Sequence, residues 1–154
     1  MLTIRDFQEK GEELLYDTFS SKVLFDETLF RNKRVLIVGA ADFVQEEIGE
    51  LRSTQFDLVV KFNGSFDLPL TFCDGQSLRC DLLFSNLLLN PNLKQLVNNG
   101  LQRMIIRVPR KVDFHIFYRF FLRNLSYHHI VKLVHIDRWN DVGSMIDHSL
   151  PTSG

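Results

Sequence analysis

The sequence predicts an α/β fold of Rossmann-like type, in which helices cover both faces of a doubly wound, mostly parallel sheet. Short apolar runs rich in β-branched residues alternate along the chain with stretches of helical periodicity. The first of these runs, at residues 35–38, shows no alternation of polar and apolar side chains, which is typical of a strand covered on both faces. The chain of 154 residues has the size of a single domain with one core, so we expect residues 1–154 to form one domain.

The first predicted element is an amphipathic helix at residues 3–20. Thr3 and Asp6 have the spacing of a capping box at its start. The apolar side chains of this segment fall on one face, which we expect to pack on the sheet. They are Ile4, Phe7, Leu14, Leu15 and Phe19.

The run Val35-Leu-Ile-Val38 predicts the first strand. Because the run is apolar throughout, we expect a central parallel strand that is covered on both faces. Gly39 ends this strand, and Asp42 is the expected N-terminal cap of a helix at residues 43–51. This sequence of strand, turn and helix is the opening unit of a Rossmann-like fold.

The same alternation continues along the rest of the chain. Further strands are expected at residues 57–62, 81–84, 104–108 and 130–136, and further helices at residues 93–99, 112–125 and 140–146. Gly100 follows the first of these helices, at the position where a left-handed residue is favoured. The helix at 112–125 is apolar around most of its circumference, so we expect it to be buried. Arg119 and Arg123 share one of its faces, which either binds an anion or is simply solvated.

Ligands of such sheets lie beyond the carboxyl ends of the strands, near the point where the strand order reverses. Asn63 and Asn86 come directly after predicted strands, where a side-chain amide can donate to a phosphate or read a base and a ribose. The alternative is that each amide satisfies nearby backbone groups of its loop. Gly39 by itself indicates only a turn, because the other glycines of a dinucleotide-binding fingerprint or of a phosphate-binding loop are absent from the sequence.

Taken in order, four segments resemble the sialyltransferases. They are Arg34-Val-Leu-Ile-Val-Gly39, Phe56-Asp-Leu-Val-Val-Lys-Phe-Asn63, Asp74-Gly-Gln-Ser-Leu-Arg-Cys-Asp-Leu-Leu-Phe-Ser-Asn86 and Pro151-Thr-Ser-Gly154. In that family, a strand ending in Val-Gly-Asn is followed by a Val-Val-Arg-Phe/Met-Asn strand and an Asp-Val-Gly-x-Lys-Thr segment. A Pro-Ser/Thr-Ser/Thr-Gly turn comes much later in the chain. The resemblance spans nearly the whole sequence.

The resemblance implies a glycosyltransferase that uses CMP-sialic acid as donor and a glycan as acceptor, without a cofactor. It places Asn63 against the nucleotide and Asn86 close to the donor, with Gly39 and Ala40 at the donor turn. It also implies that the final turn holds the phosphate or the sugar carboxylate, which suits hydroxyl groups and turn amides as anion donors. The residues of this turn are Thr152, Ser153 and Gly154.

The sequence departs from the family pattern at several positions. Ala40 stands where the family has asparagine, and Lys61 stands where it has arginine. The family's catalytic-base histidine lies downstream of the final turn, beyond Gly154, so we expect a domain truncated after this turn and leave its activity open. His148 is the candidate acid or base within the chain, because histidine titrates near neutrality. The alternative is a solvated tail histidine.

Two other interpretations remain open. A non-enzymatic α/β interaction or scaffold domain derived from such a fold would retain the sheet and lose the site; an apolar patch left exposed on it would favour self-association. A different nucleotide-dependent enzyme on a similar fold is the third. The acceptor, the linkage and the oligomeric state are not predicted by the sequence.

Composition limits the choice of partners and compartment. Eighteen basic residues face nineteen acidic ones, so no broad field draws a nucleic acid, and nucleic acid is not an expected partner. Charges interrupt the first residues and no apolar run has the length of a membrane span, so we expect a cytoplasmic protein. Cys73 and Cys80 are then expected as free thiols, with a disulfide as the alternative. The five histidines lack metal-binding spacing, so no metal site is expected.

Overall fold

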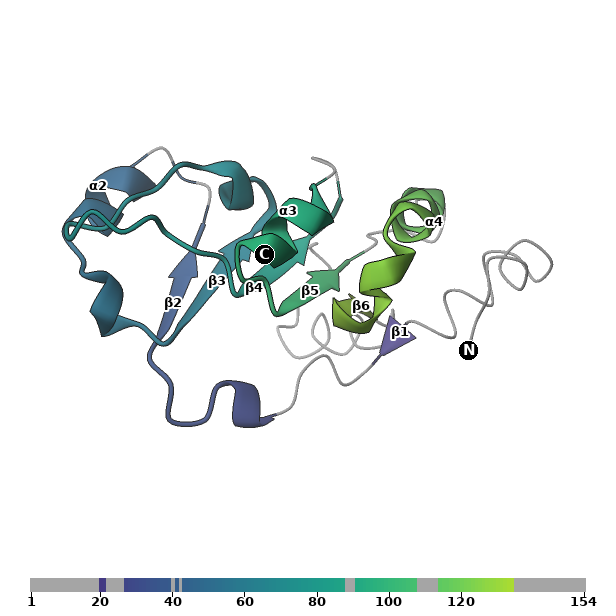
Figure 1. Ribbon diagram of the computed structural model, residues 1–154, viewed down its shortest axis with the longest axis horizontal. Helices are drawn as coiled ribbons and strands as arrows, with labels where there is room; N and C mark the ends of the chain where they lie inside the picture. The colour runs from purple at the N-terminus through teal and green to yellow at the C-terminus, as the bar shows by residue number, and fades with distance from the viewer. Residues whose placement is uncertain are drawn as a thin grey trace, which may run out of the picture.

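A computed structural model describes residues 20–21, 27–39, 41, 43–87, 91–107 and 114–134 of the chain. Its centre is a sheet in which every pair of neighbouring strands is parallel, in the order β1-β6-β5-β4-β3-β2 (Figure 1). The strands are β1 (Ser20–Ser21), β2 (Val35–Val38), β3 (Leu58–Phe62), β4 (Leu82–Ser85), β5 (Arg103–Ile106) and β6 (Val131–Val134). The α-helices are α2 (Val44–Gly49), α3 (Leu93–Asn98) and α4 (Phe114–Arg123).

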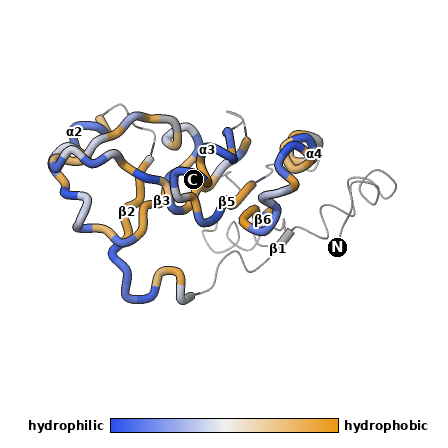
Figure 2. Tube along the Cα trace, viewed as in Figure 1, coloured by the Kyte–Doolittle hydropathy of each residue, from blue (hydrophilic) through white to orange (hydrophobic). Residues whose placement is uncertain are grey.

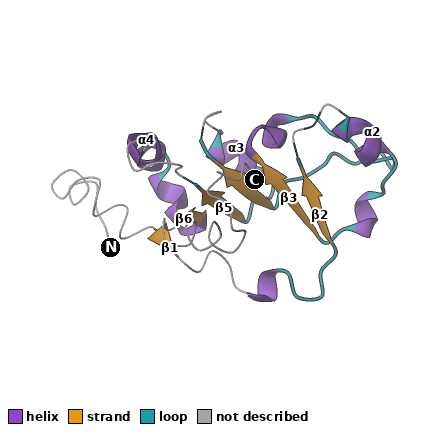
Figure 3. Cartoon of the chain, turned by 180° about the vertical axis from the view of Figure 1, so that it is seen from behind, coloured by secondary structure: helices purple, strands orange, loops and turns teal. Residues whose placement is uncertain are grey.

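Short 3-10 helices complete the described elements. They are η1 (Glu27–Leu29), η2 (Ser53–Gln55), η3 (Asn63–Asp67) and η5 (Leu125–Ile130). Figures 1 and 3 show α2, α3 and α4 along one side of the strands and η1 on the opposite side. The chain therefore covers both faces of a parallel sheet, and the predicted Rossmann-like α/β fold is confirmed.

The helical face of the sheet is closed by the aromatic helix α4. Strand register places Leu83, Met104 and Val131 in one row across β4, β5 and β6, and all three are buried in one apolar cluster. Phe117 and Phe121 of α4 join this cluster with their ring centroids 5.8 Å apart. The predicted burial holds for one face of this helix, where Phe117 is fully buried. Arg119 and Arg123 are exposed on the helix surface.

A hairpin-like loop takes the place of a helix between β3 and β4. Its apolar side chains Leu70, Phe72 and Leu78 pack with α2 over the start of the sheet. Thr71 and Ser77 form an isolated antiparallel bridge in this loop. The connection thus completes the helical face without helical periodicity.

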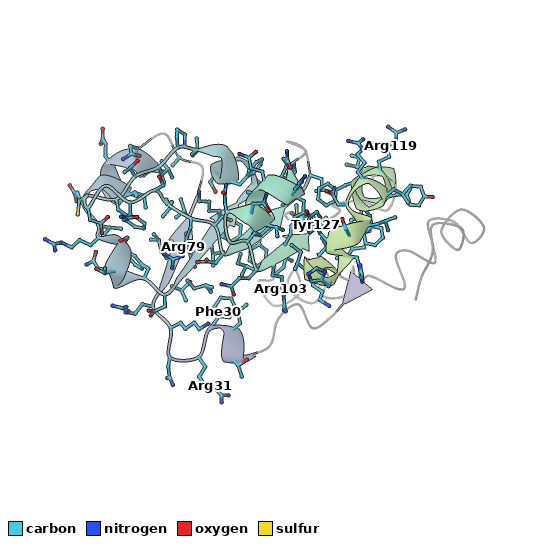
Figure 4. The ribbon with its side chains drawn as sticks, in the orientation of Figure 1. Phe30, Arg31, Arg79, Arg103, Arg119 and Tyr127 are labelled. Carbon is cyan, nitrogen blue, oxygen red and sulfur yellow. The ribbon has the colours of Figure 1, made fainter. Side chains whose placement is uncertain are left out.

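The opposite face carries a smaller apolar cluster. Leu58, Val60, Leu82 and Ile105 are buried there, and Leu29 and Phe30 pack against them. Figure 4 shows Phe30 on the strand side of η1, whereas Arg31 points away from the sheet. In Figure 2 the strands are mostly hydrophobic, while the exposed connections are mostly hydrophilic.

The predicted central position of the strand at 35–38 is wrong. Among the described strands β2 pairs with β3 alone and lies at the edge of the sheet. Ile37 of this strand is 66% exposed. An unbroken apolar run indicates a strand, but it does not say how many neighbours the strand has.

Other boundaries moved by a few residues. The N-terminal cap of α2 is Phe43, without a side-chain hydrogen bond, and the predicted cap Asp42 lies outside the described residues. Gly100 has a φ of 101°, which confirms the left-handed residue after α3. Ser20 belongs to β1 and not to the predicted first helix. The rest of that helix and the helix predicted at 140–146 lie outside the described residues.

Candidate functional site

The structure brings together two of the predicted site residues, Asn63 and Asn86. Asn63 follows β3 and Asn86 follows β4, at the carboxyl edge of neighbouring parallel strands. The backbone N–H of Asn86 donates to Oδ1 of Asn63 over 3.0 Å. Both residues are partly exposed, so this edge presents polar groups to solvent.

The side-chain amide of Asn63 is oriented by this hydrogen bond. Because Oδ1 accepts from a backbone N–H, the other end of the amide is Nδ2, which has two donor hydrogens. Asn63 has a φ of 45°, a left-handed conformation that asparagine tolerates better than most residues. Residue type and backbone shape therefore agree at this position.

A buried hydroxyl lies behind Asn63 and joins the ends of β2 and β3. Ser65 is 0% exposed. Its Oγ accepts from the backbone N–H of Phe62 over 3.0 Å and lies 3.1 Å from the carbonyl oxygen of Val38, to which it can donate. The backbone N–H of Phe62 points toward β2, where it would continue the ladder of hydrogen bonds between the two strands. Ser65 Oγ binds this N–H instead, so the ladder ends without unpaired backbone groups.

The turn after β4 is shaped by a second serine. Oγ of buried Ser85 accepts from the backbone N–H of Leu87 over 3.0 Å. Leu87 has a φ of 65°, an unusual conformation for a large side chain. The backbone N–H of Arg107, just beyond β5, donates to the carbonyl oxygen of Ser85. Desolvation by burial lowers the pKa of Arg107 from its ordinary value.

Of the remaining predicted site residues, Gly39 alone belongs to the described part of the chain. Gly39 is exposed at the end of β2, with no atom within 4 Å of the position that a Cβ would take. It therefore lies in open space beyond the last residue of β2. Ala40, Thr152, Ser153, Gly154 and the candidate His148 lie outside the described residues.

Lys61 lies beneath the loop between β3 and β4, where the resemblance has an arginine. It is 2% exposed, and its Nζ donates to the carbonyl oxygen of Leu78 over 3.4 Å. Burial lowers the pKa of Lys61, and the nearby Cys80 partly opposes this shift. Lys61 therefore supports the loop from below and is not at the solvent-facing edge.

Two aspartates of the resembling segments lie at the other end of the sheet. Asp57 binds Arg34 through both oxygens, at 3.0 Å each. Asp81 is 5% exposed and accepts from Nε of Arg79 at 2.9 Å. Figure 4 labels Arg79. Each aspartate comes just before its strand, so both lie at the amino edge, away from Asn63 and Asn86. Their role is structural.

Asp74 also has a structural role. Its Oδ2 accepts from the backbone N–H and the hydroxyl of Ser53, at 2.9 and 2.6 Å, and its Oδ1 accepts from the backbone N–H of Gln76. These hydrogen bonds lower the pKa of Asp74, with the Ser53 hydroxyl contributing most. Gly75 has a φ of 79° in the same turn. The segment thus anchors the loop to η2.

Ser65 and Ser85 were not predicted as site residues. A small hydroxyl residue directly after an apolar strand was the available signal, because serine readily bonds to backbone groups of turns. The residues around Lys61 in the sequence do not indicate that its side chain is buried.

Cys73 is exposed and Cys80 is buried, and both are free thiols. Within the described part of the chain, no group of three histidine, cysteine or acidic side chains is placed to hold a metal ion. Nor is any helix in that part long and apolar enough to cross a membrane. Comparisons with protein-family models, with curated proteins and with solved structures found no match to this chain.

Proposed function

We propose that this chain is a sialyltransferase-like glycosyltransferase domain that binds a CMP-sugar donor at the carboxyl edge of β3 and β4. The observation that carries the proposal is the hydrogen bond from the backbone N–H of Asn86 to Oδ1 of Asn63. The two residues lie in separate segments of the sequence resemblance, and the proposed donor contacts require them to be neighbours. Open α/β sheets bind their ligands at the carboxyl edge of the strands. β3 and β4 end at this edge, within the run of strands that follows sequence order and not at the predicted reversal of strand order.

The chemistry of the edge suits a nucleotide. With Oδ1 of Asn63 engaged, Nδ2 can donate to an acceptor of the pyrimidine, the ribose or the phosphate. The buried hydroxyl groups of Ser65 and Ser85 form hydrogen bonds to the backbone at the ends of β3 and β4 and so fix these two strand ends. The amide is therefore preorganised, which lowers the entropic cost of binding.

Titration calorimetry with CMP and with CMP-sialic acid tests the proposal. We expect both to bind, and Asn63→Ala to weaken binding by about 1–3 kcal/mol. Asn63→Asp is the sharper variant, because it keeps an acceptor for the Asn86 N–H and replaces the Nδ2 donors with a negative charge. It should remain folded and lose CMP binding.

Asn98→Ala is the matched control. Asn98 is an exposed asparagine at the end of α3, away from the carboxyl edge of β3 and β4, so its removal should leave CMP binding unchanged. Absence of binding by the folded wild-type protein would refute the proposal. That outcome would favour the non-enzymatic interaction domain.

A further inference from the structure

The edge strand β2 presents unpaired backbone groups on its outer side. The backbone N–H of Leu58 donates to the carbonyl oxygen of Arg34 over 3.2 Å. In a parallel pair, alternate residues of one strand bond to the same neighbour. Leu36 and Val38 therefore face β3, whereas the N–H and C=O groups of Val35 and Ile37 point outward, without a partner among the described residues.

The side chain of Ile37 adds an apolar surface to this edge. At 66% exposed, it has the highest exposure of the large hydrophobic side chains that the structure describes. Its neighbours in the strand, Leu36 and Val38, are partly or fully buried in the apolar cluster beneath α2. An open edge with an exposed apolar side chain is a template for another strand.

We propose that β2 of one copy pairs with β2 of a second copy, as antiparallel strands about a two-fold axis. A two-fold axis perpendicular to the sheet brings the same edge of both copies together and makes the paired strands antiparallel. The outward residues fix the register: Ile37 lies opposite Ile37 of the partner subunit, and Val35 opposite the partner's Gly39. The sheet then continues through both copies.

Charge favours the same register. With Ile37 on the axis, exposed Lys33 lies beyond Val35, on the side of the interface where the partner's chain leaves β2 toward its α2. The first turn of α2 carries Glu46 and Glu47, both exposed. Arg34 is already paired with Asp57. The dimer would thus place Lys33 of each copy near Glu46 and Glu47 of the other copy, so the two-fold axis produces this charge contact twice.

The proposal does not depend on donor binding, since it concerns the edge of the sheet beside β2. Light scattering coupled to size exclusion, at several protein concentrations, tests it on the whole chain. We expect a concentration-dependent dimer. Ile37→Lys places two like charges opposite each other on the axis and should weaken the dimer at least tenfold.

Leu68→Lys is the matched control, because Leu68 is an exposed hydrophobic residue outside β2. This variant should remain as dimeric as the wild type. A monomeric wild type would overturn the proposal, and so would a dimer that Ile37→Lys leaves intact or that Leu68→Lys also disrupts. Circular dichroism of both variants monitors their folding.

Cross-linking tests the register without adding a charge. In a Cys73→Ser background, Ile37→Cys should form a disulfide between two copies under mild oxidation, because directly paired residues of antiparallel strands have Cα atoms about 5.5 Å apart. Leu68→Cys in the same background should remain monomeric on a non-reducing gel. Equal cross-linking of both variants, or none of Ile37→Cys, would overturn the register.

Charge reversal tests the contribution of Lys33. Lys33→Glu should weaken the dimer, and combining it with Glu46→Lys and Glu47→Lys should restore the wild-type affinity. Failure of the combined variant to regain dimer affinity would overturn the assigned charge contact.

Discussion

The carboxylate of Asp81 accepts a hydrogen bond of 2.7 Å from the backbone N–H of Val59, so a side chain before β4 fastens the start of β3. Asp57 repeats the arrangement one strand earlier, accepting from the backbone N–H of Arg34 over 2.9 Å. Each aspartate also binds an arginine, but Asp81 is buried and Asp57 is exposed. The same arrangement of an aspartate, a backbone N–H and an arginine is therefore present once at a buried site and once at an exposed site.

Asp81→Ala should lower the free energy of unfolding by about 3 kcal/mol, because it leaves a buried backbone N–H and the guanidinium of Arg79 without their acceptor. Asp57→Ala should have a smaller effect, since water replaces the lost acceptor at an exposed site. Urea unfolding of both variants measures the difference. If both variants lost the same free energy of unfolding, burial would not be the reason that Asp81 matters more than Asp57.

The contribution of Asp57 to stability should depend on pH. The hydrogen bond from Arg34 is the main reason that the pKa of Asp57 falls from 3.8 to about 2. A carboxylate with a lowered pKa in the folded state contributes stability that is present above pH 3.8 and lost as the pH falls toward 2. The stability difference between wild type and Asp57→Asn should therefore shrink over this range in urea titrations. A difference that stays constant would refute this.

Lys61→Met should stabilise the protein at neutral pH, because methionine fills the same space without a buried charge, and this outweighs the loss of the long hydrogen bond to the carbonyl oxygen of Leu78. Burial lowers the pKa of Lys61 below its ordinary 10.5, so the unfolded chain binds this proton more tightly than the folded chain. Wild-type stability should rise with pH toward 10.5, and the variant should lack this rise. Exposed Lys94→Met is the control that should change neither quantity.

The two thiols should differ in reactivity. Cys73 is exposed and should react with iodoacetamide in the folded protein. Burial raises the pKa of Cys80 to about 12, so its thiolate is scarce and its sulfur is shielded. Mass spectrometry should find one alkylated cysteine in the native state and two in urea. Rapid native labelling of Cys80 would be inconsistent with the burial described.

Gly100 and Gly49 should respond in opposite ways to alanine. Gly100→Ala forces a side chain into a φ of 101° and should destabilise the protein by about 1 kcal/mol. Gly49 ends α2 with room for a Cβ, whose nearest atom would be Nε2 of Gln45 at 3.7 Å, so Gly49→Ala should stabilise by up to about 1 kcal/mol. Thermal unfolding of both variants tests the signs.

Strands β2 to β6 were predictable because each is a short, mainly apolar run between polar turns, and β3 and β4 begin within one residue of their predicted starts. Strand β1 was not predicted, because Ser20-Ser21 has no apolar pattern. The place of β2 at the edge was not predictable either, since the number of neighbours depends on distant segments and leaves no local pattern. The loop between β3 and β4 was also only partly predictable. The alternation of Leu70 and Phe72 with other residues is typical of a half-buried extended segment, but it does not indicate that this segment covers the sheet where a helix is expected.

The sequence was enough to predict which residues lie at the candidate site, but not which atoms of those residues are in contact. Asn63 and Asn86 were identified by their places after apolar strands, and parallel register then made them neighbours. Which atom of Asn63 is engaged, and which serine supports it, depends on side-chain geometry that residue order does not encode.

Strand order also sets the order of assembly. From β3 to β6, each strand pairs with the strand just before it in sequence, so successive pairs close short loops. The pairing of Ser20 with Leu133 is different, because it joins opposite ends of the described chain. Closing that loop costs the most entropy, so β1 should dock last during folding. It should also be the first strand to exchange its amide hydrogens, a local opening that leaves β2 to β6 intact.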